Sequence, residues 1–191
     1  MKIEKIKGKI FNEKEVKSIL SGSKVQFREV IKKTQIEPSS SLDRCGMELL
    51  LSECPYQVGQ EIFVKEEIAH GGYFGACFVY CADGTKSNKM WQTHWSRHCR
   101  PANYMNEKQS RITLEITDIK VERLASISEE DAIAEGIYWE DNLGFTCGNE
   151  EGNTESPIGE FADLWNATHK KPEEKFKANP FVWVVDFKIN K

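Results

Sequence analysis

The sequence predicts an α+β fold, in which a curled sheet or small barrel of mainly antiparallel strands lies beside short helices. Three observations lead to this prediction. Polar and apolar residues alternate over several segments, as in strands with one buried face, and capping residues begin and end short helices elsewhere. The elements also follow the order helix, several strands, short helices and a last strand, without an internal repeat.

A helix and a strand are expected near the start of the chain. In residues 12–22, Asn12 is a typical N-cap, Glu15 is its capping-box partner, and Gly22 follows the last turn. From 24 to 31 the period of the apolar residues changes to two. This alternation predicts a strand with one apolar face and one polar face, the latter formed by Lys24, Gln26 and Arg28.

The middle of the chain is expected to mix loops and strands. Turn residues are frequent in 34–61 and predict a long irregular passage, whereas EIFVKEEIAH (61–70) is typical of a strand. HGGY (70–73) predicts a hairpin turn into a further strand. After a polar connection, SRITLEITDIKVERL (110–124) predicts a long alternating strand or a pair of strands.

The last third of the chain repeats the helix signals. Ser126 or Ser128 can cap a helix in SISEEDAIAEG, acidic residues fill its first turn, where the helix dipole favours them, and Gly136 can end it. Residues 138–156 are acidic and rich in glycine and asparagine, which predicts a loop. A Ser-Pro pair then begins a last helix, and FVWVVDFKI (181–189) predicts the closing strand.

The bulk properties of the chain predict a single soluble domain. Its 191 residues are 39% apolar and 29% charged, the balance of a globular protein. No signal-peptide segment and no membrane-spanning stretch is recognisable, so we expect a cytoplasmic protein with no membrane partner. The domain is expected to cover 1–191, with long loops at about 34–61, 84–109 and 138–156. The oligomeric state stays open.

The charges are distributed unevenly along the sequence. Residues 1–33 hold ten Lys or Arg against four Glu, and 86–111 hold six against one, whereas 115–163 hold two against fourteen Asp or Glu. If the two basic segments meet in space, they form an anion-attracting face that suits a nucleic acid or a nucleotide. Arg111 is then a candidate ligand contact. Ordinary solvated lysines are the alternative interpretation.

One carboxylate is expected on a buried face. In the strand 61–70, Glu66 shares its side with the apolar residues Ile62, Val64 and Ile68. A buried carboxylate needs a cation or hydrogen-bond donors. Glu66 is therefore a candidate acid of a ligand pocket, or else a member of a structural ion pair.

Two cysteines and two histidines have the spacing of a zinc finger, C-x3-C-x12-H-x3-H: Cys77, Cys81, His94 and His98. In a regular strand the two cysteines lie about 13 Å apart, too far to bind one ion without a turn between them. We therefore expect no metal and no cofactor at this site. The six cysteines of a cytoplasmic protein are expected as buried or free thiols and not as disulfides.

Common enzyme motifs are absent from the sequence. The glycine-containing segments lack the spacing of serine-nucleophile motifs, phosphate-binding loops and dinucleotide fingerprints. Three titratable residues remain as candidates: Lys24, Glu66 and Glu135. A lysine beside a carboxylate in a cleft can act as a general base or can hold an anion, so catalysis and ligand binding both stay open.

Five stretches, in order along the chain, carry a family resemblance: ILSGSKVQFREVIK, CPYQVGQEIFVKEEI, VYCADG, SRITLEITDIKVERLASISEEDAIAEGI, and FADLWN with NPFVWVVDFK. Together they resemble the ASCH domains of the PUA-like superfamily, and within it small proteins of phages and prophages. The resemblance covers most of the chain. It implies a PUA-like curled β-barrel with flanking helices and a ligand cleft beside the G-x-K segment, which here is Gly22 to Lys24.

The resemblance also implies a function. ASCH domains are associated with RNA, more than DNA, or with modified nucleosides, and one bacterial branch hydrolyses N4-acetylcytidine with a lysine, a threonine and a glutamate. The lysine corresponds to Lys24 and the glutamate to Glu135. The threonine position holds Phe27, whose ring cannot act as a nucleophile or donate a proton. The family's arginine position holds Glu29, and Arg28 is one position away, which is the other face of a strand.

Two main hypotheses follow. In the first, the cleft binds RNA, another nucleic acid or a modified nucleoside, with Lys24 and Arg28 attracting phosphate and Trp91 or Tyr104 stacking on a base. In the second, the chain is an amidohydrolase of an N4-acylated cytidine, with Lys24 as general base and Glu135 as its partner. The lost motif positions favour the first. A phage protein that acts through protein contacts is a third possibility. Expected ligand contacts are Gly22, Gln26, Arg28, Glu66 and Arg111.

Overall fold

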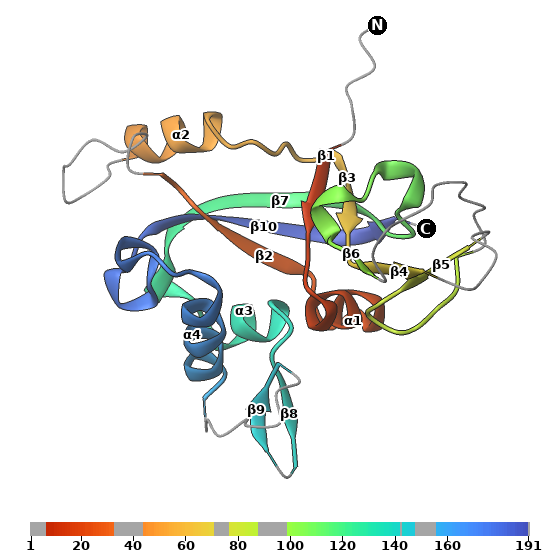
Figure 1. Cartoon of the computed structure of the whole chain (residues 1–191). Coiled ribbons are helices and arrows are strands. Elements are labelled where there is room, and N and C mark those ends of the chain that lie inside the picture. The colour runs from red at the N-terminus through yellow and green to blue at the C-terminus, as the bar shows by residue number, and fades with distance from the viewer. Residues whose placement is uncertain are drawn as a thin grey trace, which may run out of the picture. The chain divides into compact units, whose positions relative to one another are not determined.

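The structure is a computed structural model in which residues 7–32, 44–70, 77–87, 99–141, 143–147 and 156–190 are described (Figure 1). The chain divides into two compact units. The first consists of Met1–Ser21, Glu61–Glu115 and Ile189–Lys191, and the second of Gly22–Gln60 and Ile116–Lys188. The single domain expected from the composition stays a prediction.

The first unit begins with strand β1 (Lys7–Ile10) and helix α1 (Glu13–Ser21). The predicted capping box is confirmed, because Asn12 Oδ1 accepts a hydrogen bond from Glu15 N at 3.0 Å and Glu15 Oε2 accepts one from Asn12 N at 2.9 Å. The helix ends before Gly22, whose φ of 81° suits glycine.

Two sets of strands build the rest of the first unit. In one, β3 (Glu61–Lys65) pairs parallel with β1 and antiparallel with the first residues of β7 (Thr113–Arg123). In the other, β4 (Ile68–His70) lies between β5 (Phe78–Tyr80) and β6 (Cys99–Arg100), antiparallel to both. Ile68, Phe78, Tyr80 and Met105 form a buried cluster on this second sheet.

The prediction of one continuous strand over 61–70 is wrong. The chain leaves β3 after Lys65 and begins β4 at Ile68, where it takes new partners. Alternation alone could not reveal the break, because a strand keeps its period of two when it passes from one sheet to the next. The hairpin expected after it agrees with the antiparallel pairing of β4 and β5, although most of HGGY lies outside the described residues.

The second unit has the strand order β7-β10-β2. Strand β2 (Gln26–Val30) pairs antiparallel with β10 (Phe181–Asn190), with Gln26 opposite Asp186 and Phe27 opposite Val185. The strands predicted over 24–31, 110–124 and 181–189 are therefore present. Lys24 lies just before β2, in an isolated bridge to Glu135.

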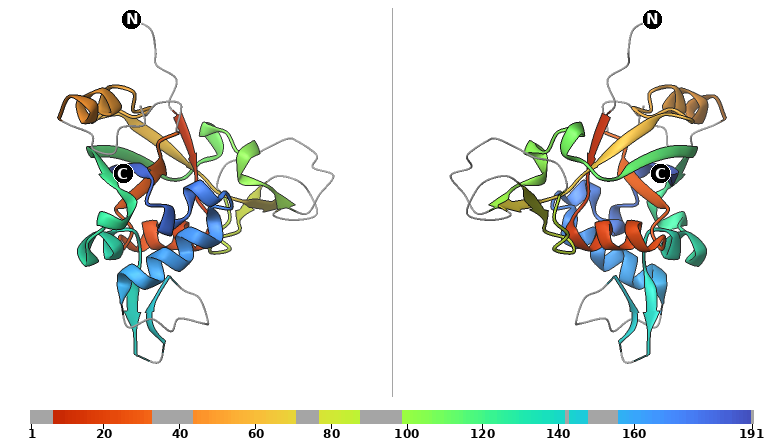
Figure 2. Two further views of the ribbon diagram at one scale, coloured as in Figure 1. Left: turned by 90° about the vertical axis from the view of Figure 1, so that its left-hand side faces the viewer. Right: turned by 90° about the vertical axis from the view of Figure 1, so that its right-hand side faces the viewer.

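Helices α3 (Glu129–Ala134) and α4 (Pro157–Thr168) lie side by side in the second unit, as Figures 1 and 2 show. Ser128 is the N-cap of α3, since its Oγ accepts a hydrogen bond from Asp131 N at 3.1 Å. A buried core lies between these helices and strand β10: Leu124, Ile127, Ala132, Ile137, Cys147, Phe161, Trp165, Val182 and Val184.

All three regions expected as loops contain regular structure, and in 84–109 it consists of β6 and two 3₁₀ helices. Helix α2 (Arg44–Ser52) lies within 34–61, and strands β8 (Tyr138–Glu140) and β9 (Gly144–Thr146) form a hairpin within 138–156. Helix α2 has no clear apolar stripe, because Leu49 and Leu51 are exposed and Leu50 is buried. A residue distant in sequence contacts the helix: Trp183 Nε1 donates to the backbone oxygen of Leu50 at 2.9 Å.

Short 3₁₀ helices complete the described chain: η2 (Ala102–Tyr104) and η3 (Glu107–Gln109) in the first unit, and η4 (Leu124–Ser126), η5 (Pro172–Glu174) and η6 (Phe176–Ala178) in the second. The α+β class is confirmed. Among the described strands no closed barrel forms, so the curled barrel stays a prediction. None of the described helices has the length and apolar character needed to cross a membrane.

Candidate functional site

The end of helix α3 is joined to the start of strand β2 in the second unit. Val25 N donates to the backbone oxygen of Ala134 at 2.8 Å, next to the bridge between Lys24 and Glu135. Gly136 follows with a φ of 99°, a conformation that ends the helix and that other residues rarely adopt. The backbone therefore places Glu135 against Lys24, although 111 positions separate them in the sequence.

Lys24 and Glu135 form a buried ion pair. Lys24 Nζ donates to Glu135 Oε2 at 2.7 Å and to the backbone oxygen of the same residue at 2.9 Å. The two residues are only 4% and 7% exposed. A charge at this depth is costly unless it has a partner of opposite sign, and here each supplies it to the other.

Arg28 binds the other side of the same carboxylate. Its Nη1 donates to Glu135 Oε1 at 3.0 Å, and its Nη2 donates to Asp131 Oδ2 at 3.2 Å and lies 4.0 Å from a carboxylate oxygen of Glu122. The guanidinium carbon lies 5.7 Å from the centre of the Phe161 ring. The Glu135 carboxylate is thus held between two cations.

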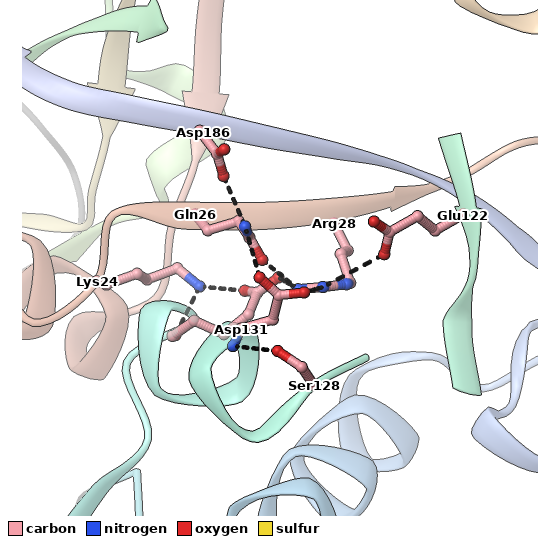
Figure 3. Close-up of polar contacts among 8 residues, drawn as sticks. Lys24, Gln26, Arg28, Glu122, Ser128, Asp131 and Asp186 are labelled. Atoms are coloured by element: carbon pink, nitrogen blue, oxygen red, sulfur yellow. Dashed lines mark hydrogen bonds and ion pairs between the residues drawn. The ribbon is translucent and has the colours of Figure 1, made fainter. Parts of the chain in front are cut away.

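Gln26 extends the network to strand β10 (Figure 3). Its Nε2 donates to Asp186 Oδ1 at 2.6 Å and to Asp131 Oδ1 at 3.4 Å, and its Oε1 accepts from Arg28. Figure 3 shows the side chains of Lys24, Gln26 and Arg28 extending from one face of the β2 segment toward α3. This confirms the predicted polar face of the strand.

The charges of the network do not balance. Two cations, Lys24 and Arg28, meet four carboxylates, those of Glu122, Asp131, Glu135 and Asp186. The cationic side chains are 4% and 1% exposed, whereas those of Asp131 and Glu122 are 26% and 28% exposed. The groups that solvent or a ligand can reach are therefore hydrogen-bond acceptors.

The opposite face of β2 belongs to the core. Phe27 is 3% exposed, meets the Tyr56 ring edge-on at 5.4 Å between centroids and lies 6.0 Å from the Phe187 ring. Beside it, Tyr56 donates from its hydroxyl to Glu29 Oε2 at 2.8 Å. Burial above all, and the neighbouring Glu29 carboxylate, raise the pKa of Tyr56. Phe27 is the core residue that strand alternation predicts.

Glu66 and Arg111 form a separate ion pair within the first unit. Arg111 Nε and Nη2 donate to the two carboxylate oxygens of Glu66 at 2.8 and 2.9 Å, and Nη1 donates to Asp83 Oδ2 at 2.8 Å. The guanidinium carbon lies 4.1 Å from the centre of the Tyr80 ring. Burial raises the pKa of Glu66, which is 1% exposed, although Arg111 opposes the shift. The hydrogen bond from Arg111 lowers the pKa of Asp83 to about 2.

The predicted site residues thus form two groups, one in each unit. Lys24, Gln26, Arg28 and Glu135 meet in the second unit, and Glu66 and Arg111 pair in the first. In the second unit, Gly22 is exposed and lies just before Lys24 in the sequence. In the first unit, Tyr104 is exposed and lies beside Arg100. The other candidate stacking residue, Trp91, and the two histidines of the zinc pattern lie outside the described residues.

Sequence reasoning missed three members of the network, Glu122, Asp131 and Asp186. Asp131 lies in the first turn of α3, where the helix dipole favours acidic residues. Its position in the sequence therefore did not indicate a functional role. Asp186 had a signal: it is the sole charged residue between Phe181 and Phe187, in a part of the strand that is otherwise apolar and buried. A charge in such a strand needs a polar partner, which is Gln26.

Comparisons with known proteins give little further information. No family model matches the chain, and no curated protein matches it. The chain is similar to a solved structure of an ASCH domain from Lactobacillus crispatus JV V101, with 14% identical residues, and the match covers 91% of this chain and 68% of that one. The TM-score is 0.33, so this likeness does not establish that the chain belongs to the family.

Proposed function

We propose that the chain binds a nucleoside, free or within single-stranded RNA, through the network around Lys24 and Glu135. One observation carries the proposal: the G-x-K lysine and the glutamate at the end of α3, two positions that the ASCH-like motifs single out, form a buried ion pair at 2.7 Å. A buried network held by so many contacts gives a rigid arrangement of polar groups, which is what selective recognition of a small polar ligand requires.

The exposed part of the network defines the chemistry of the ligand. Because Asp131 and Glu122 are its accessible members, the ligand presents N–H donors, such as the exocyclic amine and ring N–H of a nucleobase. The sequence predicted that Lys24 and Arg28 contact phosphate, and in this proposal they have a different role. Their nitrogen atoms already bind carboxylates, so they orient these acceptors and compensate part of their charge.

Binding of cytidine, N4-acetylcytidine and a labelled single-stranded RNA to the full chain tests the proposal. Titration calorimetry and fluorescence anisotropy at low and moderate salt give the affinities. We expect Asp131→Asn to weaken nucleoside binding about tenfold or more, because a hydrogen bond to a charged group contributes roughly 1.5–3 kcal/mol. The matched control is Asp163→Asn, an exposed acid on α4, which should bind as the wild type does.

Two outcomes would contradict the site. The first is an absence of binding to every nucleoside and RNA at low salt. The second is RNA binding that disappears with salt and is equal in wild type and Asp131→Asn, because it would arise from nonspecific contacts between basic segments and phosphates. A DNA strand of the same sequence shows whether the 2′-hydroxyl contributes to recognition.

A second candidate function is hydrolysis of an N4-acylated cytidine. The contact between Lys24 and Glu135 favours it, because a general base needs a partner that accepts or relays its proton. Phe27 opposes it, since a buried ring occupies the position of the hydroxyl and faces the core. Release of acetate from N4-acetylcytidine by the wild type, together with its loss in Lys24→Met, would establish the hydrolase. If the wild type binds the nucleoside but releases no acetate, the result supports the binding function alone.

A further inference from the structure

Two cysteines that are distant in sequence meet on the three-stranded sheet of the first unit. Cys81 follows β5, and its N–H donates to the backbone oxygen of Glu67 at 3.0 Å. On the other side of β4, Cys99 is opposite Ala69. Since residues 67 and 69 point to the same face of a strand, the side chains of Glu67, Cys81 and Cys99 share that face.

The donor atoms of these three residues lie close together. One carboxylate oxygen of Glu67 and the two Sγ atoms are all within 4.8 Å of one another. Around a tetrahedral zinc ion, with bonds of about 2.3 Å to sulfur and about 2.1 Å to oxygen, neighbouring ligand atoms are separated by about 3.6–3.8 Å. Small side-chain rotations therefore suffice to bring the three donors to ligand distance.

We propose that Glu67, Cys81 and Cys99 form a binding site for one zinc ion, with a fourth coordination position open to water or another small ligand. Ala69, which is opposite Cys99, is the small residue that β4 contributes to this face. Two thiolates favour zinc over magnesium or calcium, which prefer oxygen ligands. This set differs from the spacing pattern of the sequence: it uses Cys81 but takes its second sulfur from Cys99 and not from Cys77.

The electrostatic surroundings fit a cation. The carboxylates of Glu67 and Glu13 place negative charge near the sulfur of Cys81. This charge attracts a divalent cation, and one of the two carboxylates, that of Glu67, belongs to the proposed site. Neither thiol forms a disulfide, and the two Sγ atoms lie within 4.8 Å of each other.

When zinc binds, it replaces the thiol protons of Cys81 and Cys99. Each thiol releases its proton to solvent, two Zn–S bonds and one Zn–O bond form, and neither sulfur nor metal changes oxidation state. The ion joins the end of β5 to β6 across β4. On the other face of the same sheet, Ile68, Phe78, Tyr80 and Met105 supply the apolar packing. The zinc site therefore stabilises a sheet whose strands are only two or three residues long.

Metal analysis of the full chain, purified without chelator and under reducing conditions, tests the site. We expect about one zinc per chain, and a cobalt-loaded form with the near-ultraviolet absorption band of thiolate-to-cobalt charge transfer. Cys99→Ser should lose this band. Because Cys99 is exposed, the substitution leaves the core intact, which circular dichroism can verify. Glu67→Gln should weaken zinc affinity by about 10-fold or more, comparable with losses that follow smaller changes around metal sites.

Cys77→Ser is the matched control, because Cys77 lies beside β5 in the same unit but outside the group of three. It should keep the cobalt band and the zinc content. The proposal is overturned if the wild type binds no zinc under reducing conditions, or if binding persists in Cys99→Ser or depends on Cys77. A Cys81 to Cys99 disulfide in protein isolated under anaerobic conditions, detected as a mass loss of two hydrogens, would also overturn it in favour of a redox pair.

Discussion

Lys24 and Glu135 lie 111 positions apart in the sequence, and yet Lys24 Nζ donates to Glu135 Oε2 at 2.7 Å in a site that is almost closed to water. The pair is not symmetric in its surroundings. Glu135 accepts from Arg28 as well as from Lys24, so its carboxylate is shared by two cations. Loss of either residue should therefore have a different effect on stability.

Glu135→Leu should destabilise the protein more than Lys24→Met. The first substitution leaves two buried cations without their shared carboxylate, and breaking a buried ion pair typically costs about 3–5 kcal/mol. In Lys24→Met the carboxylate keeps Arg28, so we expect a smaller loss in the free energy of unfolding. Urea unfolding measures both. Lys177→Met, at an exposed lysine of the same unit, should change little, and equal losses in both network variants would contradict this account.

Phe27→Thr should not create a hydrolase. The substitution restores the hydroxyl of the N4-acetylcytidine branch, but Phe27 is on the face of β2 that packs on Tyr56 and Phe187, opposite to Gln26 and Arg28. We expect a loss of about 3 kcal/mol or more in unfolding free energy from the cavity, and no acetate release. Acetate release by Phe27→Thr would show that this position reaches the site.

Arg111→Met should make stability depend strongly on pH. In the variant, the buried Glu66 carboxylate loses its bidentate partner, so its folded pKa rises further above the usual value of 4.5. A carboxyl group with a raised folded pKa favours folding below the unfolded pKa, and this advantage is lost as the pH rises through the folded pKa. The variant should therefore lose less stability near pH 4 than at pH 7, and the missing hydrogen bond to Asp83 contributes to the loss at both pH values.

Unfolding of wild type and Arg111→Met at both pH values measures this difference. The double variant Arg111→Met with Glu66→Gln is the control, because a neutral amide at position 66 removes the titrating group. Its destabilisation should be nearly independent of pH over this range. A single variant whose deficit is the same at pH 4 and pH 7 would mean that Glu66 does not depend on Arg111 for its charge.

Tyr56 should resist ionisation in alkali. Its pKa is raised above the usual 10.0 by burial and by Glu29, so the folded protein keeps the phenol proton when the unfolded chain would release it. Stability should fall as the pH rises above 10. Burial also raises the pKa of Tyr80, so ultraviolet titration should show more than one of the five tyrosines ionising late, and Tyr56→Phe should reduce the late step by one tyrosine. A late step of unchanged size in the variant would contradict this assignment.

Local signals in the sequence predicted much of the secondary structure. The capping box of Asn12 and Glu15, the Ser128 cap and the alternation in β2 and β7 act over a few residues, and each is present. Helix α2 was missed, because its position depends on Trp183, which is distant in sequence. The break between β3 and β4 was missed for a similar reason, since pairing with new strands decides it.

The candidate site was predictable only in part. Periodicity placed Lys24, Gln26 and Arg28 on one face, and the same alternation placed Phe27 in the core. Only the ASCH-like motifs connected Lys24 with Glu135. The lone charge of Asp186 in an apolar strand indicated that it needs a polar partner, but no sequence pattern identified that partner or showed that carboxylates outnumber cations in the network.

The amino-acid sequence thus determines which residues are able to form strands, helix ends and a polar face, because hydrogen bonding to near neighbours and the alternation of side chains are local properties. The tertiary structure alone decides which charges meet. Lys24 meets Glu135, and Cys81 meets Cys99, through strand and helix ends that pack side by side. Electrostatic and metal-binding properties depend on distances of a few ångströms, which pairing across the fold sets and sequence spacing does not.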